Sequence, residues 1–320
     1  MNNGTVIYFM QDVKSGFPRL FENKYKGIIL TTLAAVLFGI TPMLASFSYS
    51  MGGTPETVTF FRNVFAIPAL LLTLCLKKIP LSLPWAVLRS IALLGIIGGG
   101  ITILLLYMSY PYIGIGTATT LHFLYPVFVC LICRIFFKER LGRQKMIVLL
   151  IAGAGILFFL DIKEITHITG LVIAGISGLT FAIYMVGMEK KKIVELNSLV
   201  ITLYLAISVS VFMLLYNIPT GKIVLLLPLK AYFYMFILAN LASFLAILLL
   251  QLGIKYLGAS TASIFCLFEP VTSLICGGFF LKEAITIEKI IGCILISSAV
   301  ILLATDKSNN SLCKIYESTD

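Results

Sequence analysis

Four polar residues in apolar stretches of this chain carry side chains that could bind a solute or a proton: Glu269, Arg62, His122 and Tyr125. Glu269 lies about halfway along an apolar run, which at 1.5 Å per helical residue puts it about 17 Å from the start. If that run is a membrane helix, the carboxyl group lies near the bilayer centre, where its charged form is costly unless it is paired or hydrated. Glu269 therefore indicates a proton-coupling or cation-binding site. The alternative is a protonated Glu that only hydrogen-bonds within the core.

Arg62 and His122 each allow two interpretations. Arg62, in the sequence TFFRNVF, either extends to the outer membrane interface or points inward, to pair with Glu269 or to hold an anionic group of a solute. His122 lies one helical turn before Pro126, and with Tyr125 it could form a polar patch facing Glu269. A single His in an apolar helix is alternatively a hydrogen-bonded packing residue.

The cysteine spacing predicts no metal site and no cofactor. Cys130 and Cys133 form a CxxC motif, but no second CxxC motif or pair of histidines accompanies it in the sequence. A zinc site would require such further ligands. On a membrane helix this spacing is interpreted as packing.

These residues belong to a chain with the composition of an integral membrane protein. Of its 320 residues, 59% are hydrophobic and 12% are charged, and the mean hydropathy is +1.04. Soluble domains contain about 25% charged residues, and a helix needs about 20 mostly apolar residues to cross a bilayer. Ten segments reach or approach that length: 27–48, 57–76, 86–108, 114–137, 146–160, 168–188, 197–217, 230–254, 258–281 and 287–304.

The net charge of +10 follows the predicted topology and does not indicate a nucleic-acid partner. Seventeen Lys and Arg residues lie in the two terminal segments and one alternating set of loops, whereas five lie in the other set. Cytoplasmic loops are enriched in these residues. Together with the apolar segments, the count predicts a multi-pass protein of the inner (plasma) membrane. The first apolar run has no small-residue cleavage site after a short core, so we interpret it as an uncleaved helix. Both tails, residues 1–26 and 306–320, are predicted to be cytoplasmic.

Two segments that start 144 residues apart, 112–147 and 256–291, follow one template. They align without a gap, and eleven of the 36 positions are identical. Because each copy has five predicted spans, the second copy must cross the membrane in the opposite direction to the first. The predicted fold class is all-α, with ten transmembrane helices in two inverted-topology repeats, 27–160 and 168–305. Such repeats are typical of transporters.

The aligned positions include Pro126 and Pro270, near the middle of the fourth and ninth spans. A proline kinks a helix, and matched kinks either shape packing only or line a cavity at the repeat interface. Small residues are also aligned in the fifth and tenth spans, at 153–155 and 297–299. Because small residues let membrane helices approach closely, we expect these two spans to pack against each other.

The two repeats resemble the EamA repeats of the drug/metabolite transporter superfamily. The residues that carry the resemblance are Pro126 with Lys138-Glu139, Glu269-Pro270 with Lys282-Glu283, and Arg62, which is similar to an arginine often found in the family's second span. Lys stands before each Glu of these pairs, where Gly is commoner in the family. The resemblance implies ten helices, cytoplasmic termini and a central cavity formed by both halves, for amino acids, sugars, nucleotides or other metabolites.

We therefore expect a transporter, and not an enzyme, that moves a small metabolite by alternating access. Glu269 would bind a proton or a substrate amine and Arg62 a carboxylate, which suits an amino acid or related solute, exported across the membrane. A lipid flippase of the same fold is the alternative. A membrane-embedded enzyme is less favoured, because the short loops contain no cluster of catalytic residue types. The sequence does not predict an oligomeric state.

Overall fold

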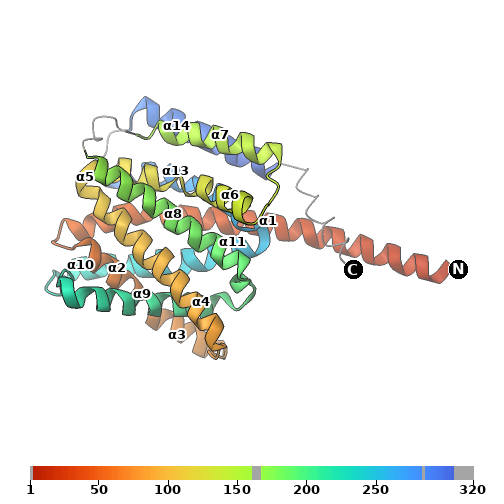
Figure 1. The fold of residues 1–320 in the computed structure, drawn as a ribbon, viewed down its shortest axis with the longest axis horizontal. Helices are drawn as coiled ribbons and strands as arrows, with labels where there is room; N and C mark the ends of the chain where they lie inside the picture. Colours follow the sequence, from red (N-terminus) through yellow and green to blue (C-terminus); the bar gives the residue numbers. More distant parts are fainter. Residues whose placement is uncertain (1–2, 161–166, 283–284, 306–320) are drawn as a thin grey trace.

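The computed structural model describes residues 3–160, 167–282 and 285–305, and every regular element in those ranges is helical. The first half contains α1 (Asn3–Tyr49), α2 (Pro55–Val64), α3 (Ala66–Leu76), α4 (Trp85–Gly95), η1 (Ile96–Ile101), α5 (Thr102–His122), α6 (Tyr125–Phe136) and α7 (Arg143–Leu157). The second half contains α8 (Ile168–Lys190), η3 (Ile193–Glu195), α9 (Ser198–Thr220), α10 (Leu229–Leu238), η4 (Ala239–Ala246), α11 (Ile247–Leu257), α12 (Ala259–Phe265), η5 (Cys266–Phe268), α13 (Glu269–Phe280) and α14 (Ile287–Ala304). The long helices lie side by side in one bundle, and α1 projects beyond it (Figure 1). The predicted C-terminal tail and Glu283 lie outside the described residues.

Eight helical segments in the described ranges are long and apolar enough to cross a membrane, so this is a multi-pass membrane protein. The sequence predicts ten spans. The difference arises where helices merge or are short: the 38-residue segment Trp85–His122 includes the third predicted span and the first part of the fourth. The rest of the fourth span is the 12-residue α6, and the fifth corresponds to α7, which has 15 residues.

Glycines break the backbone at the start of the fourth and ninth predicted spans. Gly114 has φ 70° and ψ 161°, and Gly258, its partner in the repeat alignment, has φ 76° and ψ 159°. This region of backbone conformation is accessible essentially only to glycine. The sequence identity between these two positions therefore reflects one backbone geometry that occurs in both halves.

A second pair of breaks occurs at the aligned prolines. Pro126 and Pro270 lie in the first turns of α6 and α13, where a missing backbone N–H costs no helical hydrogen bond. The structure thus differs from the predicted kink within a continuous helix. Each proline begins a new helix after a short interruption, at Phe123 and Leu124 in one repeat and at the 3₁₀ helix η5 in the other.

Each half also contains a π-helix, and the two lie at matching places. The helix η1 covers residues 96–101 and η4 covers residues 239–246, so the two coincide closely when the numbering is shifted by the repeat length of 144. Short π-helical segments are rare and occur frequently at functional sites. Their repetition is consistent with a functional site near the middle of the third and eighth predicted spans.

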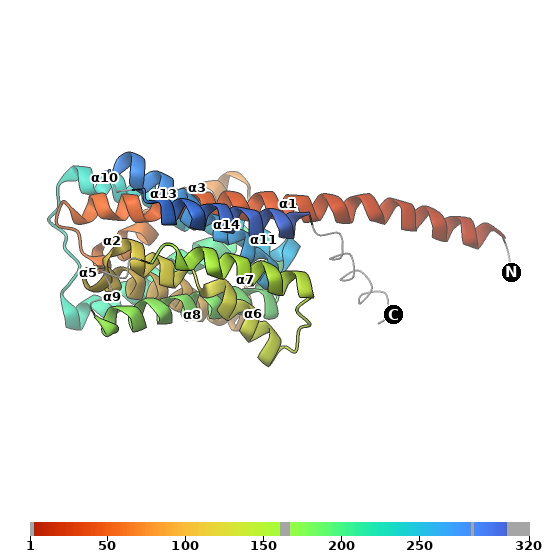
Figure 2. The same ribbon diagram turned by 90° about the horizontal axis from the view of Figure 1, so that it is seen from above.

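The helices α7 and α14 pack against each other, as the sequence predicts for the fifth and tenth spans. Figures 1 and 2 show them as a pair along one side of the bundle. The contact runs through Gly155 and Gly292: a Cβ atom added to Gly292 would lie 2.7 Å from the carbonyl oxygen of Gly155. The adjacent Gly153 has no neighbouring atom within 4 Å of such a Cβ, so only part of the aligned small set makes the contact.

The first helix of each half packs against the other half. The helix α1 lies against α11 and α13, and α8 lies against α5 and α6. In terms of predicted spans, the first span contacts the eighth and ninth, and the sixth contacts the third and fourth. This reciprocal arrangement places the interface of the two repeats in the centre of the bundle.

Candidate functional site

A cavity lies at this central interface. Both halves contribute to it, through α1, α2, α5 and η1 from the first and through α8, α9, η4 and α13 from the second. Most of the wall is apolar or aromatic. The polar side chains that line it are those of Thr41, Arg62, Asn63, Tyr107, Tyr110, Thr119, His122, Tyr184, Ser243 and Glu269.

Arg62 points into the bundle and not to the membrane interface, since only 4% of its surface is exposed. Its Nε donates a hydrogen bond to Oγ of Ser243 at 3.0 Å, and its Nη1 donates to the hydroxyl of Tyr107 at 3.1 Å. Both partners are neutral. Among the described residues, no carboxylate oxygen lies within 4.0 Å of the guanidinium group, so the charge of Arg62 is not neutralised by an ion pair.

Glu269 is the first residue of α13, and its side chain lines the cavity. The helix α1 approaches very closely here: a Cβ atom on Gly39 would lie 2.7 Å from the carbonyl oxygen of Glu269. The break before α13 and this glycine together position the carboxyl group at the wall. Arg62 and Glu269 thus line one cavity from different repeats without forming a direct ion pair.

His122 lines the cavity, whereas Tyr125 does not. His122, the last residue of α5, lines the cavity, and its Nδ1 lies 3.0 Å from Oγ of Ser177 on α8. Tyr125 is fully buried behind it, with its ring centroid 5.5 Å from that of His122 and 4.9 Å from that of Phe181. Of the predicted polar patch, the cavity wall includes His122 and Glu269 but not Tyr125. The matched prolines Pro126 and Pro270 are not among its lining residues either.

Sequence reasoning missed Thr41, Tyr110 and Ser243. The hydroxyl groups of Thr41 and Tyr110 are buried, and neither has a hydrogen-bond partner among the described residues. Ser243 is the residue that holds Arg62 from the opposite repeat. One signal could have identified it: Ser243 aligns with Gly99 in the first repeat, so a polar residue in a mostly apolar predicted span stands where the other copy has glycine.

Two polar networks join the halves outside the cavity. In the first, Lys190 at the end of α8 contacts Glu139, just after α6, and also Glu189 at 3.0 Å. Glu189 in turn accepts a hydrogen bond at 2.5 Å from the backbone N–H of Ala259, at the start of α12. This network connects the ends of α6 and α8 with the start of α12, and it includes the Glu of the first Lys-Glu pair.

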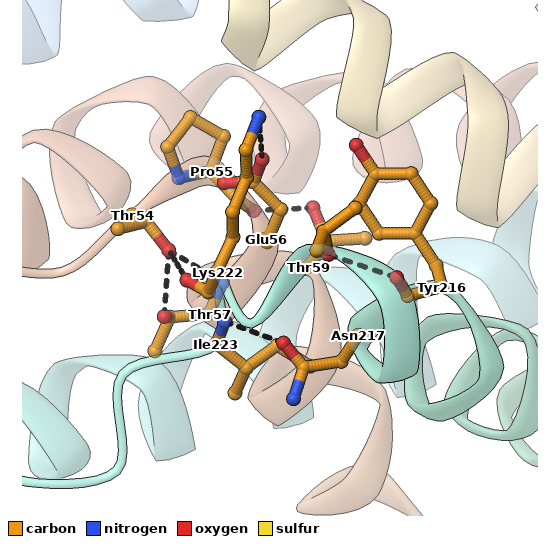
Figure 3. A network of polar contacts seen from close by, with 10 residues as sticks. Thr54, Pro55, Glu56, Thr57, Thr59, Tyr216, Asn217, Lys222 and Ile223 are labelled. Atoms are coloured by element: carbon orange, nitrogen blue, oxygen red, sulfur yellow. Dashed lines mark hydrogen bonds and ion pairs between the residues drawn. The ribbon is translucent and has the colours of Figure 1, made fainter.

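The second network joins the start of α2 to the loop between α9 and α10 (Figure 3). Thr54 donates to the carbonyl oxygen of Lys222 at 2.8 Å, and Oγ1 of Thr57 accepts from the backbone N–H of Val224 at 2.8 Å. Nζ of Lys222 lies 3.6 Å from Oε1 of Glu56, whose side chain is buried. These contacts also connect one repeat with the other.

A multi-pass helical bundle with a charged central cavity between two repeats defines the class of protein: a membrane transporter. Comparison with known families agrees, since the profile described as the EamA-like transporter family matches residues 25–160 and again residues 168–305. The chain belongs to this family, which is part of the drug/metabolite transporter superfamily.

The individual relatives share about a quarter of their aligned residues with this chain. One is named an uncharacterized transporter of Archaeoglobus fulgidus and is 27% identical over 217 residues, 65% of this chain and 74% of the relative. A second uncharacterized transporter of that organism is 24% identical over 271 residues, 84% of this chain and 93% of the relative. A solved structure described as "Crystal structure of protein" aligns with a TM-score of 0.71 at 16% identity, over 87% of this chain and 97% of that one. The structural match shows the fold alone.

Proposed function

We propose that this protein is a secondary transporter that moves a small metabolite across the inner membrane by alternating access. The observation that carries the proposal is the central cavity, which both repeats line. The first repeat contributes Arg62 to it and the second contributes Glu269. Relative movement of the two repeats around such a cavity would expose it to one side of the membrane and then to the other.

The polar groups favour a zwitterionic solute, an amino acid or a related compound. Arg62 has two donors engaged with neutral oxygens and no carboxylate within ion-pairing distance among the described residues. A buried, unneutralised guanidinium favours a carboxylate ligand, which it can bind in a bidentate manner. Glu269 supplies the complementary group, for the solute's ammonium or for a coupled proton.

We infer the membrane arrangement from the repeat. In this arrangement the chain crosses the membrane ten times, with α6 completing the fourth crossing and α7 forming the fifth. Each repeat then has five crossings, and because five is odd, the two repeats lie in opposite orientations in the membrane. The Lys and Arg distribution favours cytoplasmic termini. The reciprocal packing of α1 and α8 against the opposite half supports a two-fold relation between the repeats. Export is the direction proposed.

The first test compares the metabolites that accumulate outside cells producing the intact protein or Glu269→Gln at equal membrane levels. A solute enriched only with the intact protein would identify the cargo and support Glu269 as a site residue. Glu288→Gln is the matched control, because Glu288 is an exposed glutamate in the first turn of α14, away from the cavity. Equal enrichment with Glu269→Gln would contradict the role proposed for Glu269.

Reconstitution into liposomes tests the transport proposal itself. The solute found above, loaded on one side, should exchange with labelled solute on the other side in the presence of intact protein. Alternating access predicts that unlabelled solute on the opposite side accelerates uptake of the label. The absence of exchange with correctly inserted protein would contradict the proposal.

A further inference from the structure

The hydrogen bonds of Ser177 determine which nitrogen of His122 carries a proton. Oγ of Ser177 lies 2.6 Å from the carbonyl oxygen of Ala174, one turn earlier in α8. Two oxygens at that separation need a hydrogen between them, and a carbonyl oxygen can only accept. The single hydroxyl hydrogen of Ser177 is therefore engaged with Ala174.

The same oxygen lies 3.0 Å from Nδ1 of His122. Because Ser177 has no second hydrogen to donate, its Oγ accepts this hydrogen bond and Nδ1 of His122 carries the proton. No carboxylate oxygen of a described residue lies within 4.0 Å of the imidazole ring, and the side chain is 5% exposed. A buried imidazolium without a counter-charge is costly, so the ring is neutral and Nε2 is a bare acceptor.

Nε2 of His122 therefore complements the other polar groups of the cavity wall. Arg62 can only donate, and the hydroxyl of Tyr107 already accepts from it. Within the described residues, Ser177 is the hydrogen-bond partner of the His122 ring, so Nε2 is free to accept a bond from a ligand in the cavity that His122 lines. Such an acceptor recognises an N–H or O–H donor. The ammonium group is the donor that every solute of the proposed zwitterionic class carries.

We propose that Ser177 is a positioning residue that holds His122 as its Nδ1–H tautomer, so that Nε2 accepts a hydrogen bond from an ammonium group of the transported solute. This inference rests on the proposed transport function. His122, in the first repeat, would then give the solute's amine a second contact in addition to Glu269, which belongs to the second repeat.

The tautomer can be observed directly, because the chain contains only two histidines, His122 and His167. His167 is exposed, so His167→Asn leaves one signal in ¹⁵N-histidine-labelled protein. Two-bond ¹H–¹⁵N correlations should show a protonated Nδ1 and an unprotonated Nε2. In the Ser177→Ala variant, we expect the proton to move to Nε2. An Nε2–H tautomer in the protein with intact Ser177, or an unchanged tautomer in Ser177→Ala, would overturn the assignment.

Ser210→Ala is the control, since Ser210 is a buried serine that donates to its own helix at Ala206 without contacting a histidine. It should leave the spectrum of His122 unchanged.

The ligand is tested with an equimolar mixture of the twenty protein amino acids. The mixture should shift the Nε2 resonance in a saturable manner, and Ser177→Ala should weaken this binding about tenfold. If the tautomer is as proposed but the mixture causes no shift, the ammonium assignment fails. The transport function would then still be judged by the exchange assay, which does not depend on the spectrum.

Discussion

Arg62 of α2 donates a hydrogen bond across the repeat interface to Ser243 of η4, with 3.0 Å between Nε and Oγ. The positions that match these residues in the repeat alignment are Ala206 and Gly99, which also line the cavity but cannot form such a bond. The polar contact therefore occurs at one of the two matched places only. The duplicated scaffold thus encloses a cavity whose polar lining differs between the halves.

The Arg62–Ser243 contact should be energetically coupled. Arg62→Lys keeps the charge but loses the forked guanidinium geometry, and Ser243→Ala removes the acceptor. We expect each change to reduce exchange of the identified solute about tenfold, and the double variant to be no worse than the more impaired single one. Initial rates of exchange in liposomes measure this. Strictly multiplicative losses would show that the two residues act independently.

Gly114 should tolerate no side chain, because its φ of 70° and ψ of 161° are essentially restricted to glycine. Gly114→Ala should lower the stability of the purified protein by about 1–3 kcal/mol, seen as a lower midpoint of thermal unfolding in detergent. The control is Gly116→Ala, two residues further on, where an added Cβ would have no neighbour within 4 Å. Equal midpoints for both variants would contradict the role given to the break.

Gly292 should be equally sensitive, for a different reason. Its missing Cβ makes room for the carbonyl oxygen of Gly155, so Gly292→Ala forces α7 and α14 apart and should destabilise the protein by about 1–3 kcal/mol. Gly153→Ala, on the same pair of helices but in open space, should be close to neutral. If the two variants unfold at the same temperature, the close approach of the two helices does not contribute to stability.

Thr57 connects α2 to the loop after α9 and should stabilise the arrangement in Figure 3. Thr57→Val removes the acceptor for the backbone N–H of Val224 and the 2.7 Å contact with the hydroxyl of Thr54. This donor is partly buried. Leaving such a donor without its partner costs about 1 kcal/mol, so the unfolding midpoint should fall. Thr73→Val is the control, since the Thr73 hydroxyl bonds only its own helix, at Ala69. A larger loss for Thr73→Val would contradict the prediction.

The Lys-Glu pairs of the two repeats align in the sequence, but the reason for the match lies in the backbone conformation of their lysines. Lys138 and Lys282 follow α6 and α13 with φ values of 54° and 56°. This left-handed conformation is common just after the end of a helix and is easiest for glycine, yet lysine adopts it at both matched positions of this chain. The register of the pair was visible in the sequence, but the backbone conformation that it serves was not.

The sequence by itself determined the class of protein, the duplication, the pairing of α7 with α14 and the set of polar residues worth examining. These depend on hydrophobic length, residue identity and spacing along the chain, which need no knowledge of long-range contacts. The tertiary structure decided which way each polar side chain faces. Arg62 turns inward to Ser243, His122 reaches the cavity while Tyr125 lies behind it, and the two prolines begin helices. Packing against helices distant in the sequence fixes how a helix is rotated about its own axis and where it breaks. In an almost uniformly apolar span, the local sequence pattern cannot specify either the rotation or the break.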